Sequence, residues 1–294
     1  MEGLLVEVVC AAKRRNILGE GPCWDAARGR LYWLDIHGRL LEWLSPSDRR
    51  IGLWTLEAKA SAVAPRGDGT LLMATEKGLA TFDPDAGVMT LRQEVEPDRP
   101  LNRTNDGNVD PHGRFWFGTM QDGEHEPTGA VYRLDPDWSV RRVLDGLTIP
   151  NTLVTSPAGD VLYVADSFFG VIWAYELDPA TGALGERRTF VDTSADGCAP
   201  DGSAVDEEGC LWNAQWGGWR VVRYRPDGTV DRIVKMPVQQ PSSCAFGDED
   251  LSTLYVTSAR EGLGEAELAG QPLAGSLFSF RPGVRGAPLP PFAG

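Results

Sequence analysis

Four polar residues, each a carboxylate or an amide, stand at matching places in a pattern that repeats along the chain. They are Glu20, Asn105, Asn151 and Asp201, and each lies 10 or 11 residues ahead of the apolar residue that anchors one repeat. No Lys or Arg stands at the same place. Such groups are costly to bury unless a cation or ordered water satisfies them. Oxygen donors of this kind suit a divalent ion such as Ca²⁺, Mg²⁺ or Mn²⁺.

A simpler interpretation treats these residues as turn formers. Asn and Asp commonly cap strand ends, and the motifs NDG, PN and PDG around them are typical of turns. The other two repeats have Ala60 and either Ser242 or Ser243 at the same place. Coincidence in four repeats nevertheless favours the ion site. A zinc site built on histidine is disfavoured, because the chain has 3 histidines and none is in metal-ligand spacing.

The repeat that positions these residues consists of short strands. Six aromatic and β-branched runs, each following a turn, have anchors spaced 40, 44, 47, 49 and 43 residues apart, close to the length of a four-stranded propeller blade. The anchors are Leu31, Leu71, Phe115, Leu162, Leu211 and Leu254. A second family of strands, as in AVYRLDPD and VVRYRPDG, ends in turns and supplies the outer half of each blade. The sequence therefore predicts an all-β, six-bladed β-propeller with four-stranded blades.

The strand before each anchor run is expected to be the innermost one, lining the central channel. Equivalent positions in successive blades are related by rotation about the propeller axis, so the four polar side chains should point to a shared centre. The apolar segment LLVEVV at residues 4–9 has no blade of its own, and we expect this N-terminal strand to pair in the last blade and close the ring. Residues 1–294 are expected to form a single domain, with 283–294 as an extended tail. No stretch has sustained helical periodicity.

Composition and charge bear on partners and location. The net charge of -14 would repel phosphate backbones and anionic lipid surfaces, so neither nucleic acid nor membrane is an expected partner. The chain has no apolar run of about 18 residues that would predict a membrane span, and Glu2 and Glu7 disrupt any signal-peptide pattern. The cysteines form an odd set without a CxxC pair, which favours a reducing, cytoplasmic setting. We expect a monomer or a weak homo-oligomer.

Four motifs around the polar residues together resemble the gluconolactonase/regucalcin family of sugar-lactone hydrolases, also called the senescence-marker-protein family. They are LGEGPCW from Leu18, NRTNDGNVDPHGRFWFGTM from Asn102, IPNTLVTSPAGDVLYVADS from Ile149 and PDGSAVDEEGCLW from Pro200. The resemblance spans residues 16–281. The stretches TMQDGE, WGG and SAREGL are more similar to the bacterial branch, which hydrolyses pentono- and hexonolactones, than to the animal branch.

The resemblance implies roles for individual residues. It matches Glu20, Asn151 and Asp201 to the metal ligands of the family, in agreement with the repeat argument. It matches Arg103 and Asn105 to residues that bind the substrate.

A further carboxylate of the family contacts sugar hydroxyls just after the GTM motif. Here that stretch reads QDGEHE, and Asp122 and Glu124 compete for the role. Thr104 stands where many members have an aromatic residue or proline, which could alter the pocket wall.

The predicted function is metal-dependent hydrolysis of a sugar lactone to the aldonic acid, the substrate being an aldono-1,4- or 1,5-lactone such as glucono-, xylono- or arabinonolactone. A metal can polarise the carbonyl, stabilise the oxyanion and lower the pKa of bound water. Asp201 could then serve as ligand and general base together, or pass a proton to the ring oxygen as it leaves. Family members differ in the ion they use, so one divalent ion is expected, with Ca²⁺ favoured and Zn, Mn, Mg or Fe left open.

Two other functions stay open at this point. One is a non-enzymatic calcium-binding or interaction propeller, because a fold does not imply a function. The other is a promiscuous metal-dependent esterase or phosphotriesterase at the same site. No GxSxG elbow or P-loop motif occurs, so serine-esterase and nucleotide chemistry have no support. Trp216 and Trp219 could stack on a sugar ring or pack between blades.

Overall fold

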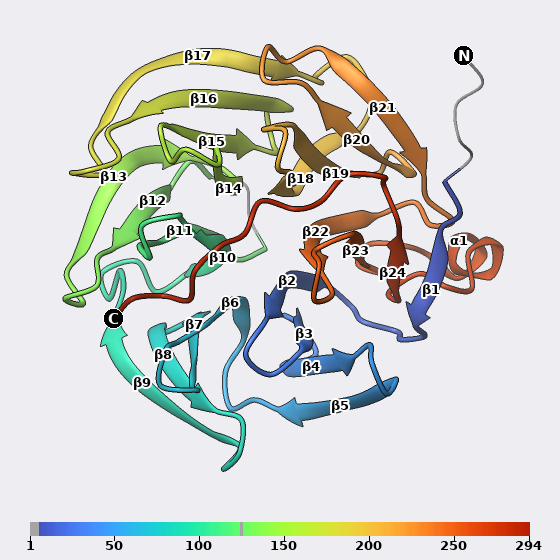
Figure 1. Cartoon of the computed structure of the whole chain (residues 1–294), viewed down its shortest axis with the longest axis horizontal. Helices are drawn as coiled ribbons and strands as arrows, with labels where there is room; N and C mark the ends of the chain where they lie inside the picture. Colours follow the sequence, from blue (N-terminus) through green and yellow to red (C-terminus); the bar gives the residue numbers. More distant parts are fainter. Residues whose placement is uncertain (1–5, 124–125) are drawn as a thin grey trace.

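In the computed structural model, which describes residues 6–123 and 126–294, six four-stranded sheets stand around a central axis (Figure 1). In five of these sheets the strands follow chain order from the axis outward, and neighbouring strands pair antiparallel. The sixth sheet has the order β22, β23, β24, β1, so it takes its outermost strand from the other end of the chain. The prediction of an all-β, six-bladed propeller with four-stranded blades is therefore confirmed.

Each strand of a blade has its own place between the axis and the rim. The innermost strands are β2 (Gly19–Asp25), β6 (Ala60–Pro65), β10 (Asn102–Val109), β14 (Pro150–Thr155), β18 (Ala199–Val205) and β22 (Pro241–Gly247). The second strands are β3 (Arg30–Asp35), β7 (Leu71–Thr75), β11 (Phe115–Gln121), β15 (Val161–Asp166), β19 (Leu211–Trp216) and β23 (Thr253–Ser258). The third strands are β4 (Leu40–Ser45), β8 (Gly78–Asp83), β12 (Gly129–Leu134), β16 (Val171–Leu177), β20 (Arg220–Tyr224) and β24 (Leu277–Phe280). The outermost strands are β5 (Arg50–Thr55), β9 (Val88–Glu94), β13 (Val140–Leu147), β17 (Leu184–Asp192), β21 (Val230–Lys235) and β1 (Val9–Ala12).

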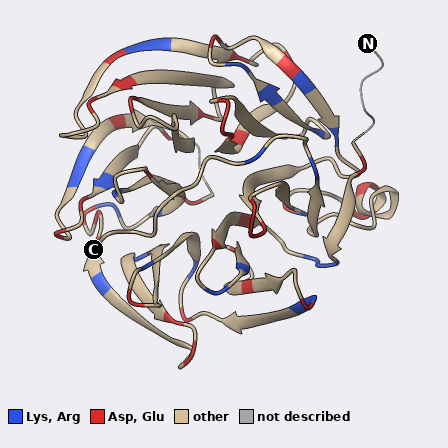
Figure 2. Cartoon of the chain, viewed as in Figure 1, with Lys and Arg blue, Asp and Glu red and all other residues tan. Residues whose placement is uncertain are grey.

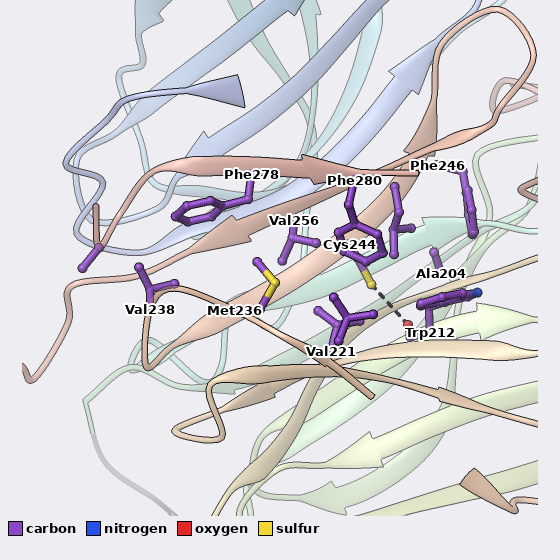
Figure 3. Close-up of a cluster of buried hydrophobic side chains, with 13 residues drawn as sticks. Ala204, Trp212, Val221, Met236, Val238, Cys244, Phe246, Val256, Phe278 and Phe280 are labelled. Atoms are coloured by element: carbon purple, nitrogen blue, oxygen red, sulfur yellow. Dashed lines mark hydrogen bonds between the residues drawn. The ribbon is translucent and has the colours of Figure 1, made fainter. Parts of the chain in front are cut away.

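Apolar side chains of neighbouring blades interlock between the sheets. All six anchor residues of the repeat are fully buried. Figure 3 shows one such cluster, in which Trp212 and Val221 of the fifth blade pack with Val256 and Phe278 of the sixth. A single blade would leave both of these faces in water, so each blade depends on its two neighbours for its core.

The N-terminal strand closes the ring, but it begins later than the sequence predicted. β1 pairs antiparallel with β24, as in the pair Val9 with Ser279. The predicted strand at residues 4–9 thus overlaps β1 at one residue, and residues 4 and 5 lie outside the described part of the chain. Val6 and Val8 instead pack against the cluster between the fifth and sixth blades. Their apolar character reflects side-chain packing rather than strand pairing.

A short helix, α1 (Glu265–Gly270), lies between β23 and β24 and was not predicted. Six residues are fewer than two helical turns, which is too short for a periodic pattern to be recognised. No helix in the described residues has the length and hydropathy needed to cross a membrane.

The last residues of the chain cross the mouth of the central channel (Figure 1). We call residues 285–294 the C-terminal strap. Ala287 N donates to Val205 O in the fifth blade, and Phe292 N donates to Pro65 O in the second. Both acceptors lie at the ends of innermost strands, so the strap covers the face at which these strands end. Figure 2 shows Lys and Arg dispersed over the blades among acidic residues.

Candidate active site

An irregularity of the innermost strands aims the polar residues at the axis. In every blade of the described structure, the pairing of the innermost strand with the second strand shifts register where the repeat places its polar residue. The shifts lie between Glu20 and Cys23, Ala60 and Ala62, Thr104 and Gly107, Asn151 and Val154, Pro200 and Ser203, and Pro241 and Cys244. A β-bulge bends its strand and redirects a side chain. Gly21 and Thr152, each following a polar residue, accordingly have φ of 54° and 56° in the left-handed region.

The three predicted metal ligands lie at one end of the central channel. Glu20, Asn151 and Asp201 all stand near the starts of their strands, at the face opposite the C-terminal strap. They are 8%, 5% and 6% exposed. Residues separated by 131 and 50 positions in the sequence therefore meet at one buried site.

The two carboxylates of this site repel one another. Burial and the charge of Asp106 raise the pKa of Glu20 to about 8. Burial, Glu20 and Asp106 together raise the pKa of Asp201 well above its ordinary value. Neither Glu20 nor Asp201 forms an ion pair with a Lys, Arg or His among the described residues; Glu20 Oε2 accepts a hydrogen bond from Gly21 N at 3.1 Å. A cation between them would remove the repulsion and lower both pKa values.

The donor set fits a hard divalent cation. Two carboxylates and the Oδ1 of Asn151 offer oxygen ligands, and Oδ1 keeps a lone pair after accepting one hydrogen bond from Asn105. No cluster of three or more His, Cys, Asp or Glu side chains within the described ranges is arranged to hold a metal. The candidate ligand set is therefore mixed, and it would leave coordination positions for water and substrate.

Asp106 is a third, half-buried carboxylate beside this site, and the sequence analysis did not select it. Its oxygens accept hydrogen bonds from Gly107 N at 2.8 Å and from Leu153 N at 3.2 Å, and burial raises its pKa. Asp106 was passed over because each repeat was assigned one polar residue, and Asn105 filled that place in the NDG motif. The adjacent carboxylate was the signal that could have identified it.

The predicted substrate-binding residues form a hydrogen-bond chain that reaches the metal ligands. Arg103 Nε donates to Asp122 Oδ1 at 2.9 Å, and Arg103 Nη1 donates to Asn105 Oδ1 at 2.8 Å. Asn105 Nδ2 donates to Asn151 Oδ1 at 3.0 Å. Asn151 Nδ2 in turn donates to Ser167 Oγ at 2.8 Å. Arg103, Asn105 and Asp122 thus share one hydrogen-bond network with the candidate ligand Asn151.

Of Asp122 and Glu124, the structure describes Asp122 alone, so the choice between them stays open. Asp122 joins the network through Arg103, whereas Glu124 lies outside the described residues. Lys59, which the sequence analysis did not select, donates to the other oxygen of Asp122. Burial alone would raise the pKa of Asp122, but Lys59 and Arg103 hold it below its ordinary value.

The aromatic residues at this face differ in packing. Trp216 packs against Leu18, Ile36 and Ala259, as expected of an aromatic between blades. Trp219 is 43% exposed in the loop that follows β19. Trp216 is half-buried, so Trp219 is the more exposed of the two.

Two cavities lie away from the carboxylates. One, of about 710 Å³, lies under the C-terminal strap at the opposite mouth of the channel, among largely apolar residues such as Val109, Val154 and Phe246. The other, of about 530 Å³, is an open groove beside the third blade lined by residues such as Leu101 and Thr128. Neither is lined by Glu20, Asn151 or Asp201, so neither holds the candidate chemistry.

Fold and site together define a six-bladed β-propeller with a carboxylate and amide oxygen site at one end of its axis. Residues 18–260 match the family described as SMP-30/Gluconolactonase/LRE-like region. The chain belongs to this family, as its motifs predicted.

Characterised relatives extend over nearly the whole chain. It is 39% identical over 287 residues to L-arabinolactonase of Azospirillum brasilense, covering 96% of this chain and 94% of that protein. It is 35% identical over 286 residues to 6-deoxy-6-sulfogluconolactonase of Pseudomonas putida, covering 97% and 98%. The crystal structure of a calcium-binding regucalcin from Agrobacterium tumefaciens superposes with a TM-score of 0.93 at 33% identity, covering 98% of each chain.

Proposed function

We propose that this protein hydrolyses a sugar lactone, an aldono-1,4- or 1,5-lactone, to the aldonic acid with the help of one divalent metal ion. The chain is an enzyme, a hydrolase of cyclic esters, as its lactonase relatives indicate. The observation that carries the proposal is the meeting of two unpaired buried carboxylates with a network of sugar-type hydrogen-bonding groups. The unpaired carboxylates support a bound metal ion, and the hydrogen-bond network supports a polyhydroxylated substrate.

Glu20, Asn151 and Asp201 would hold the ion. When bound, it would polarise the lactone carbonyl and lower the pKa of water. All three ligands are oxygen donors, which favours Ca²⁺ and leaves Mg and Mn open, with Zn or Fe less suited to the set.

Asp201 is proposed as the general base. A water molecule adds to the carbonyl carbon, and its proton passes to an Oδ atom of Asp201. The bond between the carbonyl carbon and the ring oxygen then breaks, and the ring oxygen takes up the proton from Asp201 and leaves as a hydroxyl group. Arg103, Asn105 and Asp122 would orient the sugar hydroxyls, since they offer both donors and acceptors.

A second candidate function is calcium binding without catalysis. It is favoured by the likeness to a structure described as a calcium-binding protein. The same oxygen ligands would serve both functions, so the two differ only in turnover. A promiscuous esterase or phosphotriesterase activity would use the same ion and water on other substrates.

The experiment that separates these functions is a panel of pentono- and hexonolactones, an aryl ester and a phosphotriester, assayed by acid release after chelation and re-addition of each metal. We expect turnover of at least one aldonolactone that depends on added metal and exceeds that of the other two classes. Calcium binding with no turnover of any lactone would instead support the binding function.

We also propose a reducing, cytoplasmic location and a monomer or weak homo-oligomer. All five cysteines are free thiols. Size-exclusion chromatography with light scattering would test the assembly, and a stable dimer at micromolar concentration would contradict it.

A further inference from the structure

Lys59 joins the substrate-binding network from the neighbouring blade. It immediately precedes β6 in the second blade, whereas Arg103 and Asp122 belong to the third. Its Nζ donates to Asp122 Oδ2, while Arg103 Nε donates to Asp122 Oδ1 at 2.9 Å. Asp122 is therefore held from both sides by cations on two different blades.

The main chain around Lys59 is itself fixed. Lys59 N donates to Glu76 Oε1 at 3.2 Å, and Lys59 O accepts a hydrogen bond from Glu76 N at 2.9 Å. The ammonium group thus extends from a part of the blade that is already ordered. A binding group held in this way loses less conformational entropy when a ligand arrives.

Donors and acceptors remain free in the Lys59–Asp122–Arg103 cluster. Lys59 Nζ uses one of its three N–H groups, and Arg103 Nη2 makes no hydrogen bond to a described residue. The Lys59 and Asp122 side chains are 21% and 31% exposed, so solvent and small ligands can reach them. A sugar hydroxyl can accept from the cations and donate to the carboxylate at once.

We propose that Lys59 is a specificity-determining residue that, together with Asp122 and Arg103, binds two adjacent hydroxyl groups of the substrate. The inference rests on the proposed lactone hydrolysis and deepens it. Substrates with a neighbouring pair of hydroxyls match the alternating cation, carboxylate, cation order of the cluster.

The test uses Lys59→Met, which keeps the length of the side chain and removes its charge. We expect KM for a hydroxyl-rich sugar lactone to rise roughly 10- to 100-fold, the range for losing a hydrogen bond to a charged group. Values of kcat/KM for δ-valerolactone, which has no hydroxyls, should stay unchanged. Lys59→Arg should recover much of the sugar-lactone KM. Lys77→Met, at an exposed lysine in the next hairpin, is the matched control and should behave as wild type.

A second measurement does not need turnover. Titration calorimetry with a cyclic polyol that lacks the lactone carbonyl should give a lower affinity for Lys59→Met than for wild type. If the wild type binds this polyol through Lys59 but hydrolyses no lactone, the proposed function fails and the role of Lys59 stands.

Three results would overturn the role of Lys59. They are unchanged KM and polyol affinity in Lys59→Met, an equal loss of activity on sugar lactone and δ-valerolactone, and no polyol binding by the wild-type protein. The second result would mean that Lys59 merely stabilises the fold near the site.

Discussion

At the scale of single residues, the charge balance at the axis determines what the site can do. Burial first, and then repulsion among Glu20, Asp201 and the half-buried Asp106, raise the pKa of both ligand carboxylates. The charge of Arg103 offsets part of the rise in the pKa of Glu20, but Arg103 forms its ion pair with Asp122. The positive charges of the site therefore stand on the substrate side, and the negative charges stand where a metal would bind.

Asp201→Asn is the sharpest test of the chemistry, because it keeps the shape of the side chain and removes its charge. With saturating metal, we expect the lactonase rate to fall by roughly 10²- to 10⁴-fold, as for loss of a positioned general base. The matched control is Asp227→Asn in the second PDG turn, where the carboxylate only accepts hydrogen bonds from Thr229. The Asp227→Asn variant should keep the wild-type lactonase rate. Turnover by Asp201→Asn within about threefold of wild type would remove Asp201 from the mechanism.

Arg103→Ala tests the assignment of Arg103 to substrate. The variant loses the bonds to Asp122 and Asn105, so we expect kcat/KM for sugar lactones to fall roughly 10- to 100-fold. Metal content, measured by elemental analysis, should stay at the wild-type level. Loss of metal from this variant would show that Arg103 supports the ligands rather than the substrate.

At the scale of the element, the bulge in each innermost strand couples the fold to the site. The residue that follows the polar residue must be small where its strand passes close to the innermost strand of the next blade. At Gly202 a Cβ atom would lie 2.0 Å from Ser243 Oγ and 2.9 Å from Ser243 Cα. Gly202 and Ser203 in β18 face Ser242 and Ser243 in β22. Because all four residues are small, the two strands can approach one another behind Asp201.

Gly202→Ala is expected to push β18 away from β22. We predict a loss of roughly 1–3 kcal/mol in the free energy of unfolding, as for overpacking, measured by urea denaturation. Activity should fall as well, because Asp201 is the preceding residue. Gly67→Ala, where no atom lies within 4 Å of an added Cβ, is the control. Equal stability of the two variants would show that the strands can separate at no cost.

In two blades, the turn at the end opposite the site is held by a buried Asp that accepts a hydrogen bond from a Trp side chain. In DPHGRFW, Asp110 Oδ2 accepts hydrogen bonds from Arg114 Nε and from Trp116 Nε1 at 2.9 Å. In DEEGCLW, Asp206 Oδ2 accepts one from Trp212 Nε1 at 2.8 Å. Each buried Asp thereby fixes the turn between the first and second strands and satisfies an indole N–H in the core.

At the scale of the whole molecule, two contacts close the ring. β1 pairs with β24 in the sixth blade, and the C-terminal strap joins the fifth and sixth blades to the second and third. Phe292 of the strap is 1% exposed and lies in the cluster between the second and third blades. The strap therefore stabilises the ring at the face opposite the site.

Phe292→Ala should lower stability without changing the chemistry. Truncating a fully buried Phe costs about 3–5 kcal/mol of unfolding free energy, which a denaturant titration would detect. Leu289→Ala changes a residue of the same strap that is 46% exposed and should have little effect. The values of kcat and KM at low temperature should match wild type in both variants. A large change in KM for Phe292→Ala alone would show that the strap also acts on the site.

Removal of the metal should lower both activity and stability. An ion that binds only the folded protein stabilises it by about 2.7 kcal/mol at one hundred times its dissociation constant. Chelation should therefore abolish turnover and lower Tm in a scanning calorimetry experiment, and re-addition of the ion should restore both. Full activity in excess chelator, with no metal in the purified protein, would contradict the metal proposal.

The sequence alone determined the number of blades, the strand nearest the axis and the axial residues. These features repeat in sequence, because each blade must bury the same apolar positions and every blade contributes an equivalent position to one centre. The repeat points to Glu20, Asn105, Asn151 and Asp201 at the axis, and the family resemblance implies that Glu20, Asn151 and Asp201 among them are the metal ligands.

Only the tertiary structure decided what lies beside those residues. The pairing of Lys59 with Asp122 joins two blades across 63 positions of sequence, and no repeat or motif connects them. Asp106 stands within the NDG motif, which is typical of a turn. Its charge raises the pKa of Glu20, and the size of that effect depends on how deeply Glu20 is buried. The start of β1 likewise depended on whether Val6 and Val8 pair with a neighbouring strand or pack their side chains against the cluster between the fifth and sixth blades. Contacts between blades depend on side-chain direction and distance, which periodicity along the chain does not specify.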